Sequence, residues 1–315
     1  MTFVHVGRGT EAAFHQAAFG GPCDAMPLTS LGEGYTEVEL DLAAEDRALW
    51  CYLKPRARPS FTAALLRDLH SVQATIEGLA RAAPGQEPMI RYFVLASRTP
   101  GVFNLGGDLT LFSEHIRAGD RDGLRRYAHS CVEIGYRNWS AYNGSVVTVG
   151  LAQGDALGGG FEGLLSCDVI VAERRARFGL PEILFNLFPG MGATSFLTWR
   201  LGAAKAQSLI MSGQVYTAEE MHALGVVDVL AEDGGGERAV REYLQRYAGR
   251  CNAHTAIYKA RRRVSPVSLA EMRDVADIWV DAALRLTEAD LRRMAHLAAA
   301  QDRNRRRVVS VQAAA

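Results

Sequence analysis

The segment Leu157-Gly158-Gly159-Gly160-Phe161-Glu162 places three consecutive glycines between an apolar residue and a carboxylate. A short β-branched run at residues 146–151 precedes it, and a helix is predicted after Gly160 to about Cys167. Glycine lets the backbone come close to a ligand and point main-chain N–H groups at it. The segment therefore predicts a strand-to-helix turn whose backbone donors face a bound molecule.

A second segment, Phe103-Asn104-Leu105-Gly106-Gly107-Asp108, shares this design of a strand, glycines and a helix. If the two turns adjoin in space, one N–H from each can converge on a thioester carbonyl and stabilise the oxyanion of an enolate. We predict that Leu105 and Gly159 are these donors. Taken singly, each segment is equally well explained as a tight turn between a strand and a helix.

Two glutamates lie close in sequence to conspicuous turn-forming segments. Glu162 ends the first segment, and Glu182 follows Phe178-Gly179-Leu180-Pro181. Two neighbouring carboxyls can exchange protons with adjacent carbons of one substrate, and their mutual repulsion favours one protonated and one ionised group. We predict that Glu162 and Glu182 form a catalytic pair. The sequence leaves open which of them acts as the acid and which as the base.

Strands and helices alternate along the chain up to about residue 193. Strands are predicted at residues 35–40, 48–53, 91–96, 146–151 and 169–172, with helices at 59–81, from 109 to about 142, and from 160 to about 167. This order is typical of βαβ units and a mainly parallel sheet, so the predicted fold class is α/β. From Ala193 onward the pattern is mostly helical, and residues 268 to about 303 predict a long amphipathic helical tail.

Composition excludes several classes of function. Lysine plus arginine and aspartate plus glutamate number 35 each in 315 residues, so no global field favours nucleic acid or an anionic membrane. The five cysteines are scattered without the spacing of a metal site, which predicts reduced thiols, no metal and a cytoplasmic location. No segment reaches roughly 18 uninterrupted apolar residues, so no membrane span is predicted.

The glycine turns and the two glutamates belong to longer sequence patterns. These patterns are Phe103-x-x-Gly106-x-Asp108-Leu109, Gly154-x-x-x-Gly158-Gly159-Gly160-x-Glu162, Cys167-Asp168, Phe178-Gly179-x-Pro181-Glu182 and Pro189-Gly190-x-Gly192. Through them, over about residues 35–300, the chain resembles the crotonase (enoyl-CoA hydratase/isomerase) superfamily. The resemblance implies a crotonase-like ββα spiral core at residues 31–235, behind an N-terminal arm at 1–30. It also implies a helical C-terminal region at 236–315 that covers the acyl pocket and takes part in oligomerisation, as a homotrimer or a dimer of trimers.

Further strings narrow the resemblance to the diffusible-signal-factor synthases. They are Val102-Phe103-Asn104-Leu105-Gly106-Gly107-Asp108-Leu109, Gly159-Gly160-Phe161-Glu162, the run from Leu180 to Gly192, and Ile278-Trp279-Val280-Asp281. That resemblance implies dehydration of a 3-hydroxyacyl thioester to a cis-2-enoyl thioester, followed by hydrolysis to a free unsaturated fatty acid used in quorum sensing. The substrate would arrive as a thioester of acyl carrier protein or CoA, and no cofactor is expected. A plain 2-enoyl-CoA hydratase/isomerase and a non-catalytic binding protein of the same fold are the alternatives.

An acyl chain needs an apolar pocket near the glutamates. The candidate substrate-binding residues are Gly106, Gly107, Phe188, Met191, Trp279 and Leu297. Ordinary core packing is the alternative explanation for the large ones. The run Arg261-Arg262-Arg263, with Lys259, is a candidate contact for an acidic carrier protein or a CoA phosphate, and a solvated charged face is the alternative.

Overall fold

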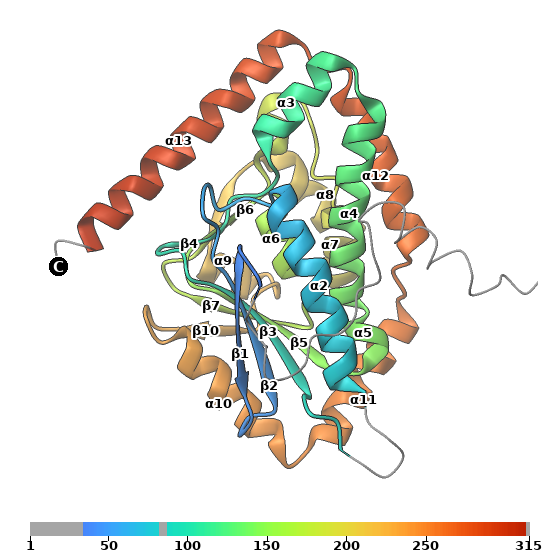
Figure 1. The fold of residues 1–315 in the computed structure, drawn as a ribbon, viewed down its shortest axis with the longest axis vertical. Coiled ribbons are helices and arrows are strands. Elements are labelled where there is room, and N and C mark those ends of the chain that lie inside the picture. The colour runs from blue at the N-terminus through green and yellow to red at the C-terminus, as the bar shows by residue number, and fades with distance from the viewer. Residues whose placement is uncertain (1–33, 82–86, 313–315) are drawn as a thin grey trace, which may run out of the picture.

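A computed structural model describes residues 34–81 and 87–312 of the chain (Figure 1). The predicted arm at residues 1–30 lies outside the described residues. Within them the main sheet has six strands in the order β1-β2-β3-β5-β7-β10, all parallel to their neighbours except the antiparallel pair β1 and β2. These strands are Val38–Ala43 (β1), Ala48–Leu53 (β2), Tyr92–Ser97 (β3), Val147–Ala152 (β5), Val169–Glu173 (β7) and Val229–Ala231 (β10). The predicted α/β class with a mainly parallel sheet is confirmed.

Both faces of the main sheet are buried, which explains why its strands are apolar throughout. In β2, Leu49 and Leu53 face a core shared with α2 and α4, whereas Trp50 and Tyr52 face a second core shared with α10. Helices α2 and α4 cover one face of the sheet and α10 covers the other (Figure 1). These helices are Ala63–Ala80 (α2), Arg121–Trp139 (α4) and Gly236–Ala248 (α10).

A second, smaller sheet contains the strands that precede the two glycine turns and the segment with Glu182. Its order is β4-β6-β8-β9, and β4, β6 and β8 are parallel. Its strands are Val102–Asn104 (β4), Asp155–Leu157 (β6), Arg177–Gly179 (β8) and Val215–Thr217 (β9). Because the carboxyl ends of parallel strands meet at one edge of a sheet, both glycine turns and the segment that carries Glu182 emerge together. The sequence did not predict this separate sheet, because strands of three residues are too short to show a period.

The sequence predicts a helix from residue 59, but α2 begins at residue 63 because residues 59–61 pair with the first glycine turn. Leu105 N–H donates to Pro59 O at 2.7 Å, and Phe61 N–H donates to Gly106 O at 2.8 Å. These bonds place the start of α2 directly against the turn. One apolar face of α2 is buried, with Leu65, Leu66, Leu69, Val72 and Ile76 on it.

Two predicted helical stretches are each divided in the structure. The stretch after residue 109 ends at Ala118, where Gly119 adopts a left-handed φ of 64° and Asp120 caps the next helix. The tail from residue 268 is likewise two helices, Leu269–Ala283 (α12) and Glu288–Gln312 (α13), separated at residues 284–287. Helix α12 packs along α4, and α13 runs down one side of the molecule (Figure 1).

The remaining helices complete the described part of the chain. They are Leu109–Ala118 (α3), Ala141–Gly144 (α5), Gly159–Leu165 (α6), Pro181–Phe185 (η2, a 3₁₀ turn), Ala193–Leu201 (α7), Ala203–Ser212 (α8), Ala218–Ala223 (α9), Cys251–Val264 (α11), Leu269–Ala283 (α12) and Glu288–Gln312 (α13). Among the helices of residues 34–81 and 87–312, none combines the length and the apolar character needed to cross a membrane.

Gly160 marks the place where the two glycine turns pack against each other. A Cβ on Gly160 would lie 2.1 Å from the backbone oxygen of Asn104 and 2.6 Å from its carbonyl carbon. We expect Gly160→Ala to lower the free energy of unfolding by about 2–3 kcal/mol or more, because backbone has to move. Gly249→Ala is the control, since nothing lies within 4 Å of its Cβ position and its φ is −78°. Denaturant unfolding of both variants checks this, and wild-type stability of Gly160→Ala would contradict the packing.

Candidate active site

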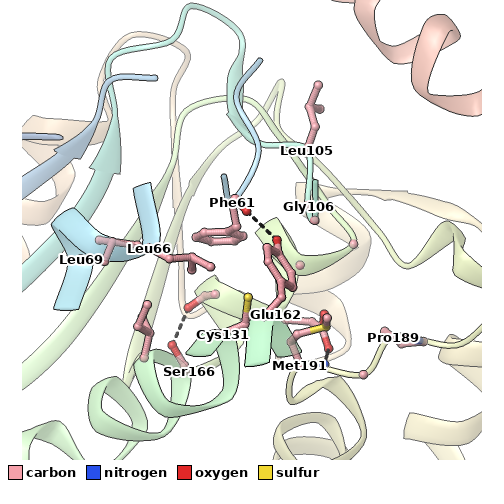
Figure 2. A pocket seen from close by; sticks show the side chains of 18 of the residues that line it. Phe61, Leu66, Leu69, Leu105, Gly106, Cys131, Glu162, Ser166, Pro189 and Met191 are labelled. Atoms are coloured by element: carbon pink, nitrogen blue, oxygen red, sulfur yellow. Dashed lines mark hydrogen bonds between the residues drawn. The ribbon is translucent and has the colours of Figure 1, made fainter. Parts of the chain in front are cut away.

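A cavity lies at the edge of the smaller sheet where the three motif segments emerge (Figure 2). The empty space in it, counting the part that opens to solvent, is about 1100 Å³. Figure 2 shows Leu66 and Leu69 of α2 on one side and Met191 on the other, with Glu162 and Cys131 between them. Most of the lining side chains are apolar, so a polar group inside the cavity meets little water.

The two glycine turns touch each other at the wall of this cavity. The Cβ position of Gly159 lies 3.4 Å from Gly106 Cα and 3.5 Å from Gly107 N, and a Cβ on Gly106 would lie 3.0 Å from Gly159 N. Gly106 and Gly158 have φ values of 96° and 51°, which favour glycine. The turns therefore adjoin, as the oxyanion-hole hypothesis requires, and a side chain at Gly106 would push them apart.

The structure contradicts one of the two predicted oxyanion donors. The N–H of Leu105 is already donated to Pro59 O at 2.7 Å, so it is not free for a substrate. In the described part of the chain, the N–H groups of Gly107 and Gly159 have no intramolecular acceptor, and both residues line the cavity. The geometry favours Gly107, rather than Leu105, as the partner of Gly159. The role of this pair in catalysis stays a prediction.

Glu162 lies in the first turn of α6, and its residue is 3% exposed. Its Oε1 accepts hydrogen bonds from the N–H groups of Met191 and Ala193, both at 2.9 Å. Burial raises the pKa of Glu162 to about 7, and the two N–H donors oppose the rise by stabilising the ionised form. Glu162 is therefore held in one orientation and titrates close to neutral pH.

Glu182 lies in the first turn of η2, directly after Pro181. Its Oε1 stands 2.6 Å from the place that a Cβ on Gly158 would take, so that glycine makes room for the carboxyl. Its Oε2 is buried and has no hydrogen-bond partner among the residues that the structure describes. Burial, and then the charge of Glu162, raise the pKa of Glu182 to about 8. Near neutral pH the Glu182 carboxyl therefore keeps its proton.

Both glutamates are tied to Gly158, since the N–H of Glu162 donates to Gly158 O at 3.1 Å and the carboxyl of Glu182 lies over the missing Cβ. Their repulsion leaves one proton on the pair. Glu182 retains it because two N–H donors stabilise ionised Glu162, whereas Glu182 Oε2 has no donor among the described residues. An acid and a base beside two free N–H groups can move protons at carbons next to a carbonyl while the oxyanion is stabilised.

The predicted substrate-binding residues divide into two groups. Five of them line the cavity, namely Gly106, Gly107, Met191, Trp279 and Leu297. Phe188 is not in the lining, and it packs against the main apolar core instead. Trp279 also belongs to that core, since it is 2% exposed and its ring centre lies 5.0 Å from that of Phe112. Contact of these residues with an acyl chain stays a prediction.

Sequence reasoning missed several lining residues on α2 and α4, among them Leu66, Leu69 and Tyr127. The helical period of α2 signals burial but not what lies against the buried face. The hydroxyl of Tyr127 donates to Phe61 O at 2.5 Å and accepts from the N–H of Asp108 at 3.2 Å. It thereby links α4 to the first glycine turn, a long-range contact that no local pattern indicates.

The basic run is only partly a solvated face. Arg262 is 9% exposed and forms an ion pair with the buried carboxylate of Asp168. The guanidinium of Arg261 lies 4.2 Å from the ring centre of Trp199 and 3.7 Å from Asp168 Oδ1. Two of the four cations therefore hold the structure together, and the other two are exposed.

Comparison with known proteins gives consistent results. The profile of the family described as enoyl-CoA hydratase/isomerase matches residues 53–285. A mevalonyl-coenzyme A hydratase (SIDH) of Beauveria bassiana is 33% identical over 193 residues, 61% of this chain and 66% of that protein. A 2,3-dehydroadipyl-CoA hydratase of Escherichia coli is 32% identical over 197 residues, 62% of this chain and 70% of that protein. Other curated relatives are matched over shorter parts, 57% and 31% of their own lengths, so the chain spans less than two thirds of several.

The fold recurs in solved structures. The crystal structure of an enoyl-CoA hydratase from Bacillus halodurans matches with a TM-score of 0.70 at 22% sequence identity. The match covers 83% of this chain and 100% of that chain. It confirms the crotonase-like fold that the motif strings predict.

Proposed function

The chain belongs to the enoyl-CoA hydratase/isomerase family, and from this premise we propose that it adds water to 2-enoyl thioesters and removes it from 3-hydroxyacyl thioesters. One observation carries the proposal: Glu162 and Glu182 line a single apolar cavity beside two N–H groups without acceptors among the described residues. The two curated relatives above are named as hydratases of coenzyme A compounds, which supports a thioester substrate.

Hydration begins with the thioester carbonyl oxygen accepting hydrogen bonds from the N–H groups of Gly107 and Gly159. Ionised Glu162 takes a proton from a water molecule, whose oxygen attacks C3 of the enoyl group. The electrons of the double bond move to the carbonyl oxygen, where the two N–H groups stabilise the enolate. Protonated Glu182 then delivers its proton to C2, which gives the 3-hydroxyacyl thioester.

Dehydration uses the same groups in reverse. Ionised Glu182 removes the proton from C2, and protonated Glu162 gives its proton to the departing hydroxide, which leaves as water. Each direction therefore starts with one proton on the pair, on Glu182 for hydration and on Glu162 for dehydration. The closely spaced pKa values of the two carboxyls let the proton exchange between them at little free-energy cost.

We expect Glu162→Gln and Glu182→Gln each to lower kcat/KM for 2-enoyl-CoA hydration by roughly 10³-fold, because each removes one proton transfer but keeps the side-chain shape. In the wild type, protonation of Glu162 below a pH of about 7 removes the base, and ionisation of Glu182 above about 8 removes the acid. The pH profile of kcat/KM is therefore bell-shaped, with its maximum between these values.

Glu114→Gln is the matched control, because Glu114 is exposed on α3 and lies outside the cavity. Loss of absorbance of the enoyl thioester follows the reaction, and circular dichroism confirms that each variant is folded. If either folded cavity variant keeps more than about a tenth of the wild-type kcat/KM, the carboxyl it lacks is not a proton-transfer group.

We further propose that the physiological substrate is a 3-hydroxyacyl thioester of acyl carrier protein and that the product is a free cis-2-unsaturated fatty acid. The strings shared with the diffusible-signal-factor synthases support this finer proposal. Hydrolysis would use the same groups, with water deprotonated by a carboxylate attacking the carbonyl carbon and the released thiolate taking up that proton. Ser166 is a poor nucleophile for this step, because its Oγ donates to Gly163 O at 2.6 Å rather than to a base.

Product analysis separates this proposal from a plain hydratase. We expect incubation with 3-hydroxyacyl thioesters of acyl carrier protein, in water enriched in ¹⁸O, to yield a free enoic acid that carries ¹⁸O in its carboxyl group. Mass spectrometry detects the label, and co-elution with a cis standard assigns the double bond. An enoyl thioester without free acid would leave hydration as the activity. Retention of unconverted thioester would instead favour a non-catalytic binding protein.

A further inference from the structure

One end of the cavity is polar, unlike its walls. Gln73, Asn138 and Tyr142 line it, and they are 3%, 4% and 3% exposed. One oxygen of each is buried without a hydrogen-bond partner among the described residues, namely Gln73 Oε1, Asn138 Oδ1 and Tyr142 Oη. Buried polar atoms without partners cost free energy, so three of them in one apolar pocket indicate a ligand group that pairs with them.

The three side chains come from different elements but form one cluster. Gln73 Nε2 of α2 donates to Ile134 O at 2.9 Å, and Asn138 lies one helical turn further along α4. Burial raises the pKa of the Tyr142 hydroxyl well above its usual value, and the Gln73 amide, which lies within hydrogen-bonding reach of that hydroxyl, partly opposes the rise. Tyr142 therefore stays protonated and can donate a hydrogen bond.

The hydrogen bonds fix which amide atoms are free. Asn138 Nδ2 donates to Ser166 Oγ at 2.8 Å, and Ser166 Oγ donates to Gly163 O at 2.6 Å. Ser166 must therefore accept from Asn138, which leaves Asn138 Oδ1 as the unpaired atom. Gln73 is fixed in the same way, because only its nitrogen can bond to the carbonyl of Ile134. The cavity thus ends in two acceptors and one hydroxyl.

The backbone that carries Tyr142 is strained. Ala141, Tyr142 and Asn143 have φ values of 50°, 53° and 60°, a left-handed region that is unfavourable for residues other than glycine. Such strain persists only where the surroundings impose it, and it is often found at binding sites. Here the left-handed turn holds the Tyr142 ring edge-on against Phe93, with centres 5.9 Å apart, at the end of the cavity.

The polar end lies within reach of a substrate held at the glutamates. The charge of Glu162 contributes to raising the pKa of the Cys131 thiol, which places Cys131 near Glu162, as Figure 2 also shows. Asn138 follows Cys131 by seven residues along α4, or about 10 Å at 1.5 Å per residue. A medium-length acyl chain that starts at the glycine turns can therefore span this distance.

We propose that Gln73, Asn138 and Tyr142 form a hydroxyl-binding subsite, and that the acyl thioester carries a hydroxyl at or near its far end; this rests on the proposed function. The hydroxyl donates to one amide oxygen and accepts from Tyr142. A carboxylate fits poorly, because it meets two acceptors and a single donor. A terminal methyl group leaves all three oxygens unpaired.

Paired substrates test this proposal. We expect hydration of 2-enoyl-CoA thioesters of increasing length to show no effect of a terminal hydroxyl on short chains. At the length that reaches the subsite, the hydroxylated chain should be preferred by about tenfold or more in kcat/KM. Equal kcat/KM for both members of every pair, with hydration intact, would overturn the subsite and leave only ordered water there.

Failure of the proposed function gives a different result, because no thioester of any length is then hydrated. The subsite is in that case judged by binding alone, with calorimetry on terminally hydroxylated and unsubstituted fatty acids of equal length. Tighter binding of the hydroxylated acid supports the subsite, and equal affinity overturns it.

Tyr142→Phe is the sharpest variant, because it removes one hydroxyl and keeps the ring that packs edge-on against Phe93, so it is expected to fold. It should bring the ratio of kcat/KM between the paired substrates toward one. Gln207→Leu, at an exposed glutamine on α8, is the control and should keep the wild-type ratio. An unchanged ratio in folded Tyr142→Phe would contradict the proposal.

Discussion

The close approach of the two glycine turns is the constraint on which the site depends. Gly160 packs so tightly on the backbone of Asn104 that no Cβ fits, and the turns meet again at Gly106 and Gly159. This contact brings two N–H groups to one wall of the cavity and sets Glu162 in the first turn of α6. The missing Cβ of Gly158 leaves the space in which the carboxyl of Glu182 lies.

Burial gives these groups their chemical character. In water two glutamates would both be ionised at neutral pH, but the apolar walls raise both pKa values. The backbone donors of Met191 and Ala193 then make the two carboxyls unequal, which separates a base from an acid. The same apolar walls make the unpaired oxygens of Gln73, Asn138 and Tyr142 costly in free energy, and a substrate hydroxyl would offset that cost.

The sequence predicts the parts of this site that depend on local chemistry. The glycine turns and both glutamates could be found because each stands in a short, distinctive run. The choice of Leu105 as a donor is contradicted because its N–H bonds to Pro59, far away in the chain. Neither the short strands of the smaller sheet nor the helix break at Gly119 could be recognised from hydrophobic periodicity in the sequence. Phe188 is large and apolar, as a residue lining an acyl pocket would be, but its side chain packs against the main core.

Titration of the two carboxyls shows directly whether Glu162 and Glu182 share one proton near neutral pH. Infrared difference spectra of the wild type against Glu162→Gln and Glu182→Gln isolate the carboxyl bands. We expect a protonated carboxyl that persists at pH 7 and ionises near pH 8, and that disappears from the spectrum when Glu182 is replaced. Ionisation of both carboxyls near the ordinary value of 4.5 would contradict this expectation.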